Sequence, residues 1–337
     1  MAWKIEAVLG TFRHRDMAAE LMRSAPGAET LRYTPNLLTE ALQPARVRYL
    51  RISNRELPHW RPMLVSPDCS FELRLNNPTD LRQISVRMVY FVNCYINPRY
   101  LYMVSSQLKE LRRTGLFEGT RATLYVISSG TEGDRLRLGN ELKQIFGDSP
   151  AVQHEHTTEN QFEYPGIHKV WQLGQQDQQG YLLYFHARGI SHLKLGRFRR
   201  NRQRQEKRLF RRVIGEWRQN LTWLQHLASA EKLGINCGGN GWVWFNFWWA
   251  RASYVHNLEQ PVVTDRRHYY EDWLGRYQPP GMRPGEYASN LNQCLSIASS
   301  PALRKFNLGS DFNPHHGETH LGLPWGKLKA LLVRLRS

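Results

Sequence analysis

The stretch ISVRMVYFVNCYI, residues 84–96, decides how the rest of the chain is interpreted. It is apolar at both odd and even positions, a pattern typical of a strand that is buried on both faces. Asn97 and Pro98 come next and suit the N-cap and the first residue of a helix. Apolar residues then recur at helical spacing until Gly115, where we expect the helix to end.

Strands and helices continue to alternate downstream of this unit. Because such alternation forms βαβ units, the predicted fold class is α/β, with a Rossmann-like and mostly parallel central sheet. Ligands of these sheets bind beyond the carboxyl ends of the strands. The further predicted elements are strands at residues 122–128 and 181–185, and helices at residues 134–146, 165–173 and 209–228.

The chain divides into three predicted segments. Residues 1–82 contain several prolines and are expected to form an N-terminal extension with short helices and a strand at residues 46–52. Residues 83–278 form the α/β domain, and residues 279–337 form a C-terminal tail that packs on it. The basic stretch RFRRNRQRQEKRLFRR, residues 197–212, is predicted to be an insertion in the domain.

Composition and charge narrow the possible partners. The 337 residues carry a net charge of +17, which attracts phosphorylated donors, acidic glycans, nucleic acid and membrane headgroups. The basic stretch has few aromatic residues for base stacking, and this disfavours nucleic acid. No apolar run is long enough for a membrane span, and the four cysteines lack a CxxC spacing. We therefore expect a cytoplasmic protein that could contact the inner face of an anionic membrane peripherally.

The segment GWVWFNFWWAR, residues 241–251, allows two interpretations. Indole rings fill large cores, and they also stack on the apolar faces of sugars. Asn246 lies among the rings, and an acidic pair, Glu271 and Asp272, follows in a second aromatic stretch. One hypothesis is a carbohydrate site in which Asn246, Trp248 and Trp249 hold a sugar. The alternative is an aromatic core strand.

The segment FHARGIS suggests a diphosphate site directly after a buried strand. His186 and Arg188 could neutralise the charge, and Gly189 allows the backbone to approach closely. In the alternative interpretation, His186 caps the strand and Arg188 pairs with a surface carboxylate. Glu271 or Asp272 could supply a general base.

No cofactor is predicted with certainty. The chain has no DxD triplet, P-loop or dinucleotide fingerprint, although Mn²⁺ or Mg²⁺ held by other groups remains an option. The spacing of His315, His316 and His320 matches no zinc pattern, and surface histidines explain it as well. His154 and His156 are weaker candidates for a metal.

The order of motifs resembles a family of glycosyltransferase-like proteins from bacteria, notably cyanobacteria, and viruses. The resemblance covers roughly residues 84–277 and rests on VYFVNCYIN, EYPGIHKVW, YLLYFHARGIS, GWVWFNFWWARASYV and YYEDWL. It implies a GT-A-type nucleotide-sugar fold. The chain departs from the family at residues 186–189, where HARG replaces the expected histidine-x-lysine-glycine, and in its basic insertion.

The resemblance implies transfer of a hexose from a nucleotide-sugar to a glycan or lipid-linked acceptor, as in surface polysaccharide assembly. Asn93 and Asn97 would lie near the nucleotide, and His186, Arg188 and Gly189 near the diphosphate. A non-catalytic protein that binds carbohydrate or nucleic acid, or a degenerate transferase that serves as a scaffold, stays open as an alternative.

Overall fold

The structure, a computed structural model, describes a large central part of the chain and separate strands outside it. The described residues are 3–9, 13–16, 30–33, 47–54, 63–65, 71–74, 80–187, 206–235, 237–238, 241–266, 268–283, 286–287 and 294–297.

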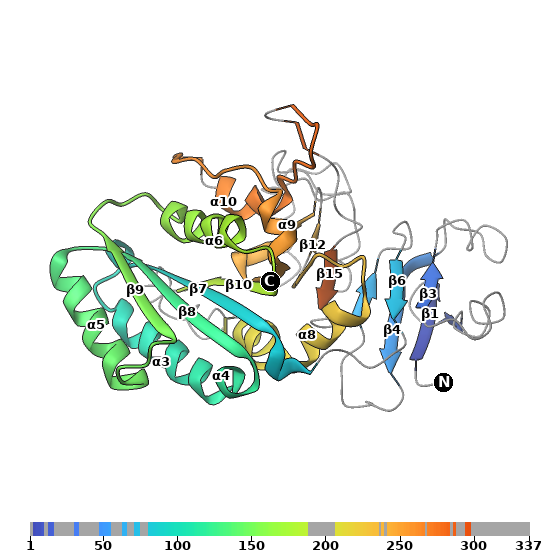
Figure 1. The fold of residues 1–337 in the computed structure, drawn as a ribbon, viewed down its shortest axis with the longest axis horizontal. Helices are drawn as coiled ribbons and strands as arrows, with labels where there is room; N and C mark the ends of the chain where they lie inside the picture. The colour runs from blue at the N-terminus through green and yellow to red at the C-terminus, as the bar shows by residue number, and fades with distance from the viewer. Residues whose placement is uncertain are drawn as a thin grey trace, which may run out of the picture.

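Parallel strands form the core of an α/β architecture, which confirms the α/β class that the sequence predicts (Figure 1). β10 pairs with β7, β7 with β8, and β8 with β9, all in parallel. The helices α3, α4 and α5 cover one face of these strands, and α6 covers the other (Figure 1). The bounds are β7 (Ser85–Asn93), α3 (Tyr100–Arg113), α4 (Leu116–Gly119), β8 (Arg121–Ser129), α5 (Glu132–Phe146), β9 (Val152–Thr157), α6 (Tyr164–Gln176) and β10 (Tyr181–His186).

The complete sheet is mixed, since antiparallel strands continue it beyond β10. β14 (Trp248–Arg251) is antiparallel to both β10 and β11 (Lys232–Gly234). β15 (Cys294–Ile297) then joins the sheet to strands from the N-terminal segment. In the described part of the chain the sheet order is β2-β1-β4-β5-β15-β11-β14-β10-β7-β8-β9.

The described parts of residues 1–82 are mainly strands, with one short 3-10 turn, η2 (Leu81–Gln83), before β7. The strand predicted at residues 46–52 is confirmed as β4, and β3 pairs with β6 in a separate two-stranded sheet. Figure 1 shows these strands beside β15, away from α5 and β9. Their bounds are β1 (Trp3–Leu9), β2 (Arg13–Asp16), β3 (Thr30–Tyr33), β4 (Val47–Asn54), β5 (Met63–Val65) and β6 (Phe71–Arg74).

The amphipathic helix predicted at residues 209–228 is present, but a π-turn interrupts it. The π-turn Arg211–Gly215 leads into α8 (Trp217–His226). Side chains satisfy a carbonyl in this turn: Val213 O accepts from Asn220 Nδ2 at 2.9 Å and from Trp249 Nε1 at 2.6 Å. Trp249 thus serves the core as a hydrogen-bond donor as well as an apolar ring.

Trp248 and Trp249 belong to the core, so their sugar-stacking interpretation is corrected. Trp248 and Trp249 are both 0% exposed because β14 lies inside the sheet, so neither indole face is open to a ligand. The segment is also not one continuous strand. It consists of β13 (Trp242–Val243), the 3-10 turn η7 (Trp244–Asn246) and β14.

Asn97 also differs from its predicted role. α3 begins at Tyr100 with Arg99 at the N-cap, and the Asn97 side chain instead accepts from Arg99 N at 2.9 Å in the preceding turn.

Among the helices that the structure describes, none combines the length and apolar composition needed to cross a membrane.

Candidate functional site

The sheet reverses its order between β7 and β10, and polar side chains gather at this point. From β7 the chain adds β8 and β9 on one side, whereas β10 lies on the other side of β7. α/β sheets bind ligands outside the carboxyl ends of their strands at such a switch point. Asn93 ends β7 and His186 ends β10, so the structure brings these two predicted residues to the same edge.

Glu163 connects the polar groups beside His186. It is the N-cap residue of α6, and its Oε2 accepts from Asn246 Nδ2 at 2.8 Å and from Tyr184 OH at 3.3 Å. Its Oε1 lies 3.4 Å from His186 Nδ1. The Glu163 and His186 side chains are 22% and 19% exposed, so a ligand could reach both.

The His186 ring is held from both sides. While Nδ1 faces Glu163, Nε2 lies 3.0 Å from Phe245 O. Only a ring protonated on both nitrogens donates to both of these acceptors. Tyr184 donates to the Glu163 carboxylate, and burial, with a contribution from the Glu163 charge, raises the pKa of Tyr184 well above its ordinary value. Its hydroxyl therefore stays a donor.

The turn η7 carries unusual backbone conformations. Phe245 and Asn246 have φ angles of 72° and 50°, in the left-handed region. This region is costly for phenylalanine, whereas asparagine tolerates it better. Asn246 is buried, and its Nδ2 donates to Tyr270 O at 3.1 Å as well as to Glu163. Its Oδ1 has no hydrogen-bond partner among the described residues. Such backbone strain is often found at functional sites.

Asn93 fixes the loop that follows β9. Its Nδ2 donates to Asn160 Oδ1 at 2.9 Å, and its Oδ1 accepts from Tyr95 N at 3.1 Å. Asn97, four residues later in the sequence, is also buried and lies in the turn before α3. Asn93 therefore shapes the edge of the site through its contacts with protein groups.

Ser128 and two histidines form a separate polar group on the face that α5 covers. Ser128 Oγ lies 2.9 Å from His154 Nε2 and 2.8 Å from His156 Nδ1. Burial, followed by the charge of His156, lowers the pKa of His154 to about 4. His154 is therefore neutral near pH 7. No group of three or more potential metal ligands exists within the part of the chain that the structure describes.

Glu271 and Asp272 lie on α10 (Tyr269–Asp272), which is next to η7 and is tied to it through Tyr270 O. Asp272 Oδ2 is 3.4 Å from Arg276 Nη2. Glu271 Oε2 is 3.3 Å from His268 Nδ1, and its side chain is 32% exposed. Glu271 therefore has the more open carboxylate of the two.

Several predicted residues lie outside the described part of the chain. They are Arg188, Gly189, most of the basic insertion, and the tail histidines His315, His316 and His320. Conversely, Glu163 is not among the residues predicted from the sequence, although the segment EYPG, residues 163–166, contained a usable signal. Pro165 suits the first turn of a helix, and this places the preceding glutamate at the helix start, close to a strand end.

Comparison with protein-family models finds no match to this chain, and a search of curated protein sequences finds none either.

Proposed function

We propose that the protein is a glycosyltransferase that binds a nucleotide-sugar at the switch point between β7 and β10. The observation that carries the proposal is the contact between His186 and Glu163 at the carboxyl end of β10, where α/β sheets bind their ligands. His186 marks this strand end, and Arg188 and Gly189, two and three residues later in the sequence, would supply a positive charge and close backbone approach for the diphosphate of a donor.

Glu163 acts in this proposal as a positioning residue. It holds the His186 ring and, through Asn246, the η7 turn, so its loss would disturb the donor site without removing a reacting group. Because Trp248 and Trp249 are buried, the sugar would be bound by polar groups at the strand ends.

Glu271 is the stronger candidate for the general base, since its side chain is 32% exposed against 15% for Asp272, which pairs with Arg276. The base would take the proton of an acceptor hydroxyl. The acceptor oxygen then forms a bond to the anomeric carbon as the bond from that carbon to the diphosphate oxygen breaks, and the nucleoside diphosphate leaves. General-base catalysis of this kind contributes about 10²–10⁴-fold to a rate.

The test is the steady-state release of nucleoside diphosphate from nucleotide-sugars, with and without Mn²⁺. We expect Glu271→Gln to lower kcat about 100-fold with little change in KM, as for loss of a general base. Glu163→Gln should mainly raise KM for the donor, because it disturbs the positioning of His186. The matched control is Asp265→Asn, which changes an exposed carboxylate that precedes α10. It should leave both kcat and KM unchanged.

Unchanged kcat in Glu271→Gln would remove this residue from the mechanism. Donor binding without turnover in the wild type would instead favour the non-catalytic alternative.

A further inference from the structure

A cavity lies near the amino end of β7, away from the candidate site at the carboxyl ends of the strands. Its volume is about 640 Å³, within the range of small-molecule sites. It is bounded by η2, which precedes β7, by the end of α3, by α4 and by the start of α8. This position separates it from the carboxyl ends of β7 and β10.

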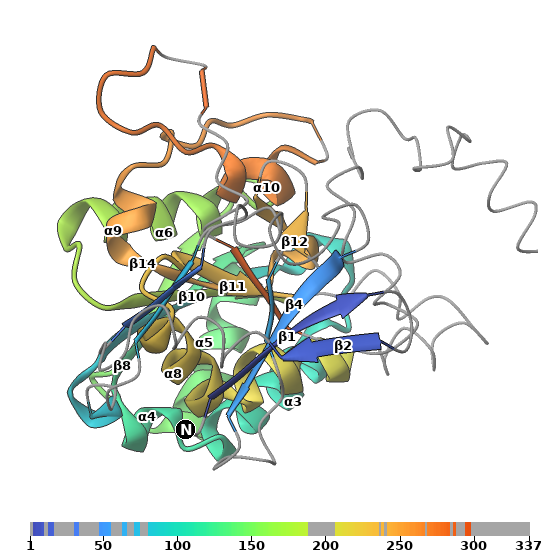
Figure 2. The same ribbon diagram turned by 90° about the vertical axis from the view of Figure 1, so that its right-hand side faces the viewer.

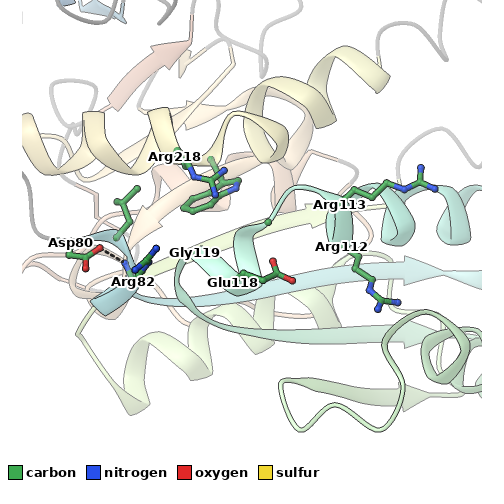
Figure 3. A pocket seen from close by; sticks show the side chains of 10 residues that line it. Asp80, Arg82, Arg112, Arg113, Glu118, Gly119 and Arg218 are labelled. Atoms are coloured by element: carbon green, nitrogen blue, oxygen red, sulfur yellow. Dashed lines mark hydrogen bonds between the residues drawn. The ribbon is translucent and has the colours of Figure 1, made fainter.

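Arginines dominate the charged lining of the cavity (Figure 3). Figure 3 places Arg218 above Arg82, with Glu118 beside them. The charged residues are four arginines and two carboxylates, namely Arg82, Arg112, Arg113, Arg218, Asp80 and Glu118. The balance is therefore positive.

Arg82 and Arg218 have no carboxylate partner within the described ranges. Arg112 differs, because its guanidinium donates to Ile145 O. Asp80 accepts from the backbone N of Arg82 at 3.1 Å and caps η2. The exposed guanidinium groups of Arg82 and Arg218, like that of Arg113 at the end of α3, thus remain available for an anion that enters the cavity.

Trp217 gives the cavity a fixed wall. Its Nε1 donates to Thr114 O at 2.9 Å, and its ring is buried. The ring lies so close to Gly119 that a Cβ there would be 2.3 Å from the Trp217 ring atom Cη2. Arg218 stacks on this ring, with its guanidinium carbon 4.3 Å from the ring centroid. Stacking holds the guanidinium plane and leaves its N–H edge for hydrogen bonds.

We propose that this basic pocket binds a phosphate or diphosphate group, with Arg82 and Arg218 as its principal contacts. Guanidinium groups bind phosphate oxygens through paired, charge-assisted hydrogen bonds, and the Trp217 stack orders one of them before the ligand arrives. Glu118 opposes the bound anion. The group could belong to a soluble metabolite or to a lipid headgroup, which share this chemistry.

The test is a calorimetric titration with inorganic pyrophosphate at about 0.15 M salt, where long-range attraction is screened. We expect Arg82→Gln/Arg218→Gln to weaken binding about tenfold, and Glu118→Gln to strengthen it about threefold, as for partly exposed charge pairs. Arg266→Gln removes the same charge just before α10 and should change nothing. Because all these side chains are exposed, thermal melts should show intact folding.

Vesicles that contain phosphatidic acid identify the source of the group. Binding of wild-type protein to vesicles, competed by pyrophosphate and lost in the double variant, would assign the pocket to a lipid headgroup. Binding of pyrophosphate but not of vesicles would assign it to a soluble ligand. Equal pyrophosphate affinity in wild type, the double variant and Glu118→Gln would overturn the proposal, as would no binding to wild type.

Discussion

Replacement of Asn246 tests whether the η7 turn is held as the structure shows. In Asn246→Ala, Tyr270 O loses a neutral hydrogen bond worth about 1 kcal/mol, and Glu163 loses a charge-assisted one worth about 1.5–3 kcal/mol. Alanine at a φ of 50° adds strain of about 1 kcal/mol. The expected decrease in the free energy of unfolding is therefore about 4 kcal/mol.

Asn246→Gly separates the backbone term from the side-chain terms. Glycine loses the same hydrogen bonds but adopts a positive φ without strain, so it should be about 1 kcal/mol more stable than the alanine variant. Urea denaturation of the wild type and the two variants gives their free energies of unfolding, which can be compared when the dependence on urea concentration has the same slope in all three. An alanine variant within about 1 kcal/mol of the wild type would refute the hydrogen bonds, because the two together are worth about 2.5–4 kcal/mol. A glycine variant no more stable than alanine would refute the left-handed conformation.

Two further predictions concern stability. Gly119→Ala should lower the free energy of unfolding by about 1–3 kcal/mol, because the added Cβ would overlap the Trp217 ring. Gly139→Ala on α5, where the nearest atom is 3.9 Å away, should raise it by about 0.5–1 kcal/mol. Urea denaturation in which both variants change alike would contradict this. The folded state keeps His154 neutral down to about pH 4, so the free energy of unfolding should fall as the pH drops from about 6.5 towards 4, where only the unfolded chain gains the proton. His154→Gln should show a shallower fall, and an identical pH profile would argue against the buried neutral ring.

The sequence predicted the core of the fold because its central strands are apolar on both faces. β7, β8 and β10 appear at nearly the predicted positions. β9 was missed since it lies at the edge of the sheet, where VQHEHT alternates partly buried and exposed residues with little apolar character. A polar strand of this kind has no hydrophobic signal to detect.

The candidate site was only partly predictable. His186 and Asn93 followed from the rule that ligands bind at strand ends, and the structure places both at the switch point. Glu163 joins them through tertiary contacts with residues far away in the sequence, which no local pattern encodes. Composition alone also could not decide between core and ligand contact for Trp248 and Trp249, because indole rings suit either role.

A thermal-shift comparison tests most directly whether a nucleotide-sugar binds beside His186, as we propose. Wild type, His186→Ala and the control Arg266→Gln would be screened at about 0.3 M salt against UDP-, GDP-, dTDP-, CMP- and ADP-sugars, with and without Mn²⁺ or Mg²⁺. We predict that one nucleotide-sugar raises the melting temperature of wild type and Arg266→Gln alike, and that His186→Ala loses most of this stabilisation. Equal stabilisation of all three proteins, or of none of them by any donor, would contradict it.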